Sequence, residues 1–115
     1  MASLAVLIRS APYGTLEAAE GVRHLAGREA LGFEDVVGLF CDEGVWTLAR
    51  GQRAAAGFTP LEPTLEKLAS EGVPLLAERG SLAERSLGRE DLLPGTQLVE
   101  PIERQLFDAD VVLVF

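Results

Sequence analysis

The chain has 115 residues and a formal net charge of -8 at pH 7, with 48% hydrophobic and 24% charged residues. This size and composition predict one domain, residues 1–115, that fills its own core without a metal or a disulfide. The acidic balance argues against direct nucleic-acid binding, because gripping a phosphate backbone needs clustered Lys and Arg. The start lacks a basic segment before a long apolar run, and no stretch reaches the roughly 20 apolar residues of a membrane span. We expect a cytoplasmic protein without membrane contact, and the single cysteine, Cys41, agrees with a reducing compartment.

Short apolar runs alternate along the chain with segments of helical periodicity. Runs of about four to eight apolar residues are typical of strands covered on both faces, whereas apolar residues spaced three and four apart are typical of helices. Thr15 and Ser81 are placed to cap helices, and Gly32 to stop one. The expected elements, in chain order, are a strand at 4–9, a helix at 15–31, a strand at 35–41, a short helix at 45–49, a helix from 60–63 to 72, a strand at 73–77, a short helix at 81–87, a strand at 96–99, a helical turn at 102–107 and a strand at 110–115.

Strands that alternate with helical segments predict a parallel sheet with right-handed crossovers and helices on both faces. The expected fold class is therefore α/β, a small three-layer doubly wound sandwich with a mainly parallel five-stranded sheet. In such sheets, ligands bind at the carboxyl ends of the strands, near the point where the strand order reverses. Three segments are expected there: residues 10–15, 42–46 and 78–81.

The first two of these segments carry a resemblance to a known family. The first strand leads into Arg9-Ser-Ala-Pro-Tyr-Gly-Thr15, and the second into Leu39-Phe-Cys-Asp-Glu-Gly-Val-Trp-Thr-Leu48. This pattern resembles the DsrE/DsrF-like family, especially its TusC (DsrF) branch, in which a Pro-hydrophobic/aromatic-Gly-Thr turn leaves the first strand and an acidic-Gly-Val-aromatic motif leaves the second. The resemblance covers most of the chain and is strongest over residues 5–52. It singles out loop residues for a ligand site or a subunit interface: Pro12, Tyr13, Gly14, Thr15, Asp42, Glu43, Gly44 and Trp46.

The resemblance implies a sulfur relay, in which a persulfide passes between cysteines of successive carriers and serves tRNA thiolation or sulfur oxidation. Catalytic members of the family carry a cysteine after the third strand, since a thiolate must attack the persulfide sulfur. In this chain that position falls near Glu78, and its neighbours offer no thiol. The implied function is a non-catalytic subunit of a TusBCD- or DsrEFH-like assembly, without a cofactor or metal. Its partners would be related DsrE-family chains or copies of itself.

Cys41 supports a second hypothesis, a persulfide carrier that uses this thiol in place of the family cysteine. Its position after two apolar residues favours a small buried hydrophobe instead. A reactive thiol also needs nearby positive charge to lower its pKa, whereas the next residues are Asp42 and Glu43.

A third hypothesis is a small-ligand module that uses a crevice near Tyr13 and Gly44. Free N–H groups at the helix start after residues 10–15 would accept an anion there, although a capped turn explains the same residues. Large aromatic side chains on loops often anchor partners, so Tyr13 and Trp46 are expected either in an oligomer contact or in packing under a loop. His24 has no second metal ligand in sight and is expected to be an ordinary helix residue.

Overall fold

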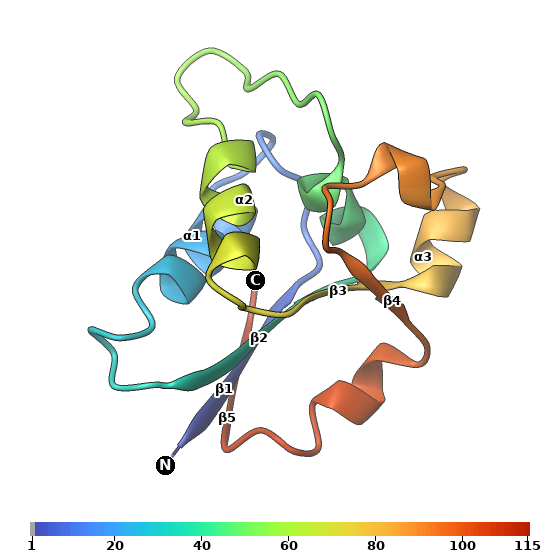
Figure 1. Ribbon diagram of the computed structural model, residues 1–115. Coiled ribbons are helices and arrows are strands. Elements are labelled where there is room, and N and C mark those ends of the chain that lie inside the picture. The colour runs from blue at the N-terminus through green and yellow to red at the C-terminus, as the bar shows by residue number, and fades with distance from the viewer. Residues whose placement is uncertain (1) are drawn as a thin grey trace.

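The computed structural model describes residues 2–115 and contains a five-stranded sheet in which all neighbouring strands are parallel. The strand order is β4-β3-β2-β1-β5, so the chain moves outward from β1 to β4 and then returns to the other side of β1 (Figure 1). The order therefore reverses at β1, as in other doubly wound sheets, and the expected α/β fold is confirmed. The strands are β1 (Ser3–Ile8), β2 (Asp35–Phe40), β3 (Leu75–Glu78), β4 (Gln97–Val99) and β5 (Val111–Val114).

Short helices connect the strands, and the two longest cover the same face of the sheet. Leu4, Val6 and Ile8 point to this face from β1 and pack against apolar side chains of α1 and α2, such as Leu25 and Leu65. Within residues 2–115, no helix is long and apolar enough to cross a bilayer. The α-helices are α1 (Glu17–Ala26), α2 (Glu62–Ser70) and α3 (Arg79–Glu84), and the 3-10 helices are η1 (Asp42–Leu48), η2 (Arg89–Asp91) and η3 (Ile102–Gln105).

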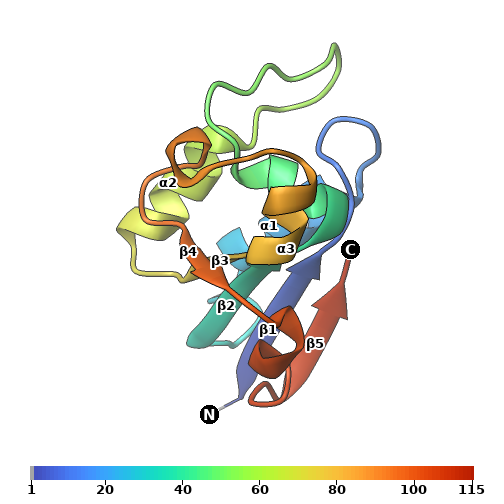
Figure 2. The same cartoon turned by 90° about the vertical axis from the view of Figure 1, so that its right-hand side faces the viewer.

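The opposite face of the sheet has a thinner cover. Alternate strand residues such as Leu7, Leu39 and Leu76 point to this side, where they pack against Ile102 of η3. The partly buried Leu106 extends this contact. The two views agree that α1 and α2 lie on one side of the sheet and the η3 turn on the other (Figures 1 and 2). The third layer of the sandwich is therefore a single 3-10 turn with its flanking chain, not a full α-helix.

The first helix is shorter than expected, since it ends at Ala26 and not near Leu31. Gly27 is a poor helix former, and after it the chain continues as turns, one of which is closed by the N–H of Gly32 on the carbonyl of Glu29 at 3.0 Å. Gly32 has the left-handed φ of +86° that its sequence position predicts, although it ends this turn and not the helix. At the other end, the expectation that Thr15 caps the helix was wrong, because the N-cap residue is Leu16, which has no side-chain cap. The Thr15 hydroxyl still accepts from the N–H of Glu17 at 3.4 Å.

The expectation that Ser81 caps the third helix was wrong. β3 extends through Glu78 and α3 begins at Arg79, so Ser81 lies inside the helix and is buried. A similar shift affects the helix expected at 45–49, because the 3-10 helix η1 already begins at Asp42. Both shifts have one cause: only Cys41 separates β2 from η1 and no residue separates β3 from α3, so each strand passes almost directly into a helix.

Candidate functional site

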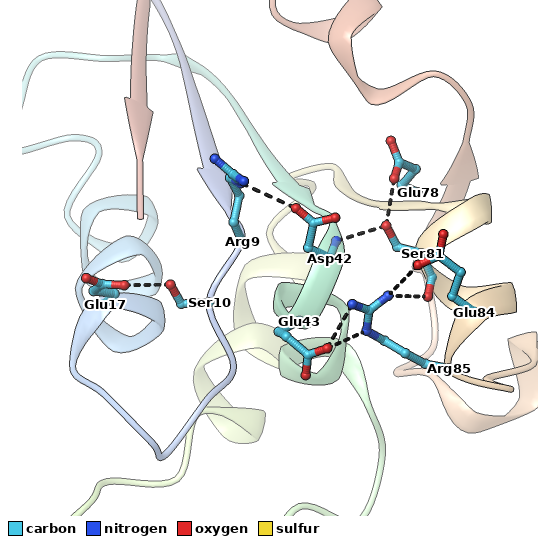
Figure 3. Close-up of polar contacts among 9 residues, drawn as sticks. All are labelled: Arg9, Ser10, Glu17, Asp42, Glu43, Glu78, Ser81, Glu84 and Arg85. Atoms are coloured by element: carbon cyan, nitrogen blue, oxygen red, sulfur yellow. Dashed lines mark hydrogen bonds and ion pairs between the residues drawn. The ribbon is translucent and has the colours of Figure 1, made fainter.

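The carboxyl ends of β1, β2 and β3 bring Arg9, which directly precedes the first candidate segment, together with residues of the other two segments in one polar cluster (Figure 3). Asp42 is its centre. The Asp42 carboxylate lies 3.4 Å from Nε of Arg9, and the Asp42 N–H donates to the Ser81 hydroxyl at 2.9 Å. That hydroxyl in turn donates to Oε1 of Glu78 at 2.6 Å. A line of polar contacts thus joins three neighbouring strand ends.

The acidic-Gly motif after β2 has a clear structural reason. Asp42 adopts a left-handed φ of +51°, a conformation that Asp tolerates better than most residues and that turns the chain directly into η1. Gly44 then packs against the end of β1. A Cβ at position 44 would overlap the backbone carbonyl of Ile8, so only glycine allows this close approach.

Tyr13 is engaged within the chain. Its hydroxyl accepts from the N–H of Leu61 at 2.9 Å and donates to Oε1 of Gln52 at 2.6 Å, and its ring meets that of Phe58 edge to face at 6.3 Å. Tyr13 therefore ties the turn after β1 to the long loop before α2. Trp46, by contrast, exposes 37% of its surface. A role of either aromatic residue in a partner contact stays a prediction.

A shallow crevice of about 390 Å³ opens where the strand order reverses, at the ends of β1 and β5. Two carboxylates line it. Glu17 accepts from the Ser10 hydroxyl at 2.6 Å, and Asp42 pairs with Arg9. The two side chains that could donate hydrogen bonds to a bound anion, Ser10 and Arg9, therefore already have an acidic partner. Beside this crevice Pro12 is half-buried and Gly14 and Thr15 are exposed. The local charge disfavours an anion at the start of α1.

Cys41 lies beside Glu78. Phe40 pairs with Ala77 in the parallel register of β2 and β3, so the next residues along both strands are neighbours on the same face of the sheet. Cys41 is 6% exposed, and its burial, followed by the charges of Asp42 and Glu78, raises the pKa of the thiol to about 11, although Arg9 acts in the opposite direction. A thiol with this pKa is protonated at neutral pH and is therefore a poor nucleophile.

Arg85 belongs to the cluster but was missed in the sequence. Its guanidinium pairs with Glu43 at 2.8 Å and donates to the backbone carbonyl of Ser81 at 2.9 Å (Figure 3). The helical spacing of four residues between Ser81 and Arg85 was a usable signal for the second contact. The ion pair with Glu43 joins segments 42 residues apart and had no local signal.

Fold and cluster together define a doubly wound α/β protein whose candidate residues gather at the carboxyl ends of its parallel strands. Within residues 2–115, no group of three or more His, Cys, Asp or Glu side chains is arranged to hold a metal ion. The model of the DsrE/DsrF-like family matches residues 2–115, and the chain belongs to this family.

Two relatives agree with this assignment, and two solved structures share the fold. The chain is 31% identical to the protein TusC homolog of Vibrio parahaemolyticus over 121 aligned residues, which cover all of both chains. It is 37% identical over 89 residues to the intracellular sulfur oxidation protein DsrF of Allochromatium vinosum, covering 76% of this chain and 65% of that one. The crystal structure of the ychN protein from E. coli has the same fold, with a TM-score of 0.87, 24% identity and full coverage of both chains. The protein MTH1491 of Methanobacterium thermoautotrophicum superposes with a TM-score of 0.70 and 16% identity, over 98% of this chain and 99% of that one.

Proposed function

We propose that this chain is a non-catalytic subunit of a sulfur-relay assembly. Its relatives include a TusC homolog and a DsrF protein of intracellular sulfur oxidation, which supports a place in such a relay. The non-catalytic part of the proposal rests on one observation, the lack of a reactive thiol. The position near the family cysteine bears Glu78, and the one thiol of the chain, on Cys41, is buried with a raised pKa.

Glu78 has a structural role that suits a subunit without chemistry. Its carboxylate cannot carry sulfur, and it accepts from the Ser81 hydroxyl, which itself accepts from the N–H of Asp42. These bonds connect the turn after β2 to the start of α3, and the charge of Glu78 also helps to keep the neighbouring thiol protonated. We infer that the cluster fixes the conformation of the turn after β2 and the start of α3, where catalytic relatives carry their cysteine.

Related DsrE-family chains are the proposed partners, and the relay would serve either tRNA 2-thiouridine formation or sulfur oxidation. The DsrF relative is named for intracellular sulfur oxidation, and tRNA 2-thiouridine formation is the alternative that the resemblance to TusC-type subunits implies. The test is co-expression with the TusB- and TusD-like chains of the same genome, followed by size-exclusion chromatography with light scattering. We expect co-elution at a defined stoichiometry. If the chain stays a monomer and does not bind either of these chains, the proposal is wrong.

Sulfur loading tests the non-catalytic part separately. The native protein is incubated with polysulfide, and intact-mass spectrometry then reports any gain of a sulfur atom. We expect no gain in the parent chain or in Cys41→Ser, and a gain in Glu78→Cys, which places a half-buried thiol near the family position. If the parent gains sulfur as fast as Glu78→Cys, and Cys41→Ser does not, Cys41 is a persulfide carrier and the non-catalytic assignment is wrong.

A further inference from the structure

The thinly covered face of the sheet becomes more exposed toward the β5 edge. Leu39, Leu7 and Val114 lie at one level of the sheet in β2, β1 and β5, and they all point to this face. Their exposed fractions are 0%, 8% and 57%. Val112, two residues before Val114 on the same face, is also exposed. Parallel sheets are normally covered on both faces, so this part of the third layer is incomplete.

The same strand has an open hydrogen-bonding edge. The N–H of Phe115 donates to the carbonyl of Leu7 at 2.8 Å, and the carbonyl of Phe115 accepts from the N–H of Arg9 at 2.7 Å. Backbone groups alternate in direction along a strand, so those of Val112 and Val114 point away from β1. No strand within residues 2–115 lies on that side. An open edge of β-branched residues without charge or proline is a template for pairing with another chain.

Exposed acidic residues lie at the start of β5 and on the connection that leads into it. Residues 103–115 contain three acidic residues and a single basic one, Arg104, and the whole chain carries a net charge of -8. Glu103, Asp108 and Asp110 are all exposed. Arg9 lies at the far end of β5, where it already pairs with Asp42. A second copy would bring the same negative charges against the surface, whereas a chain with basic residues around its own apolar strip would be attracted.

Phe107 adds a large apolar side chain on the connection from η3 into β5, and it is 83% exposed. Its neighbours Leu106 and Ala109 pack under the same face of the sheet. Exposed apolar side chains with a polar surround mark protein interfaces. We call the exposed residues Phe107, Val112 and Val114 the β5 surface.

We propose that the β5 surface docks a different protein chain, one that presents an apolar strip and an open strand edge flanked by Lys and Arg. The inference rests on the proposed function, because this partner would be a related subunit of the relay assembly. It goes further by naming the face that is used and the charge that the partner must bring. Binding covers the exposed valines, pairs the free backbone groups of β5 and neutralises part of the acidic surround.

The test uses the complex of this chain with the purified TusB- and TusD-like chains of the same genome. Val114→Lys places a charge in the β5 surface that repels a basic partner and suits an edge strand in the free chain. Asp108→Lys reverses one surrounding charge. Leu31→Lys is the matched control, because Leu31 is 50% exposed on the turn after α1, a helix that packs on the opposite face of the sheet. Circular dichroism and the thermal midpoint check that all three variants fold like the parent.

We expect Val114→Lys to weaken the binding of at least one of the two chains about tenfold or more, and Leu31→Lys to leave the affinity unchanged. Asp108→Lys should weaken the same complex, and the parent affinity should fall as salt rises. If the parent binds and Val114→Lys binds equally well, the docking surface is wrong while the proposed function stands.

Two further outcomes overturn the inference. If the parent forms a dimer and Val114→Lys is monomeric, the β5 surface binds a second copy of this chain, and the charge argument is wrong. A parent chain that stays monomeric and binds neither candidate would contradict the proposed function, and the docking proposal would fall with it.

Discussion

Alkylation of Cys41 offers a direct measure of how the fold controls the only sulfur nucleophile of the chain. Burial, with the carboxylates of Asp42 and Glu78, raises the pKa of this thiol to about 11. A cysteine in an unfolded chain has a pKa of about 8.5, so at about pH 8 the thiolate fraction is ~0.24 unfolded and ~0.001 folded. Folding should therefore lower the rate at which iodoacetamide alkylates Cys41 about 240-fold through the change in pKa alone. The 6% exposure of Cys41 should slow it further.

The assay compares alkylation rates of the native and the guanidinium-unfolded chain by mass spectrometry, from about pH 7 to about pH 10. The native rate should rise about tenfold per pH unit throughout, because the thiolate fraction grows with pH below the folded pKa, whereas the unfolded rate should level off above about pH 9. Cys41 is the only cysteine, so Cys41→Ser gives the background. A native rate within about tenfold of the unfolded rate would refute the reasoning and revive the persulfide-carrier hypothesis.

Two substitutions test the packing that holds the candidate loops. Gly44→Ala should lower the free energy of unfolding by about 2 kcal/mol or more, because the added Cβ meets the rigid backbone carbonyl of Ile8. Gly14→Ala, where nothing lies within 4 Å of the added Cβ, is its control in urea unfolding. Tyr13→Phe should lower the free energy of unfolding by about 1–3 kcal/mol, since the N–H of Leu61 loses its acceptor. An unchanged urea midpoint would show that water replaces the lost hydroxyl.

Apolar runs predicted the strands with errors of only a few residues. β1 was expected at residues 4–9 and spans Ser3–Ile8, and β2 was expected at 35–41 and spans Asp35–Phe40. A strand covered on both faces has a strong local signal, because nearly every residue must be apolar. Helix ends were less predictable. The stop at Ala26 depends on turns between residues 27 and 32, which compete with a helical pattern that continues to Leu31.

The candidate site was predicted as three segments but not as a network. Parallel strands place their carboxyl ends at one edge, so residues 10–15, 42–46 and 78–81 could be expected together from topology alone. The hydrogen bond from the N–H of Asp42 to the Ser81 hydroxyl joins residues that are 39 apart in the chain. Ser81 was expected to cap the helix, but it lies inside α3 with its side chain buried. Tyr13 was likewise expected on a loop, but its hydrogen-bond partner could not be predicted, because Leu61 lies 48 residues away in the chain.

The amino-acid sequence by itself determined the parallel α/β fold, the family resemblance and the lack of a thiol near the third strand, because hydrophobic periodicity, turn chemistry and residue identity are local properties. The burial of Cys41 was expected from its apolar neighbours and is confirmed, but only the tertiary structure decided that this thiol lies beside Glu78 and that the sheet is left open at β5. Both depend on strand register and on how far one short turn, η3, covers a face assembled from distant segments. Contacts between residues far apart in the chain leave no periodic trace in it, so they had to be seen in three dimensions.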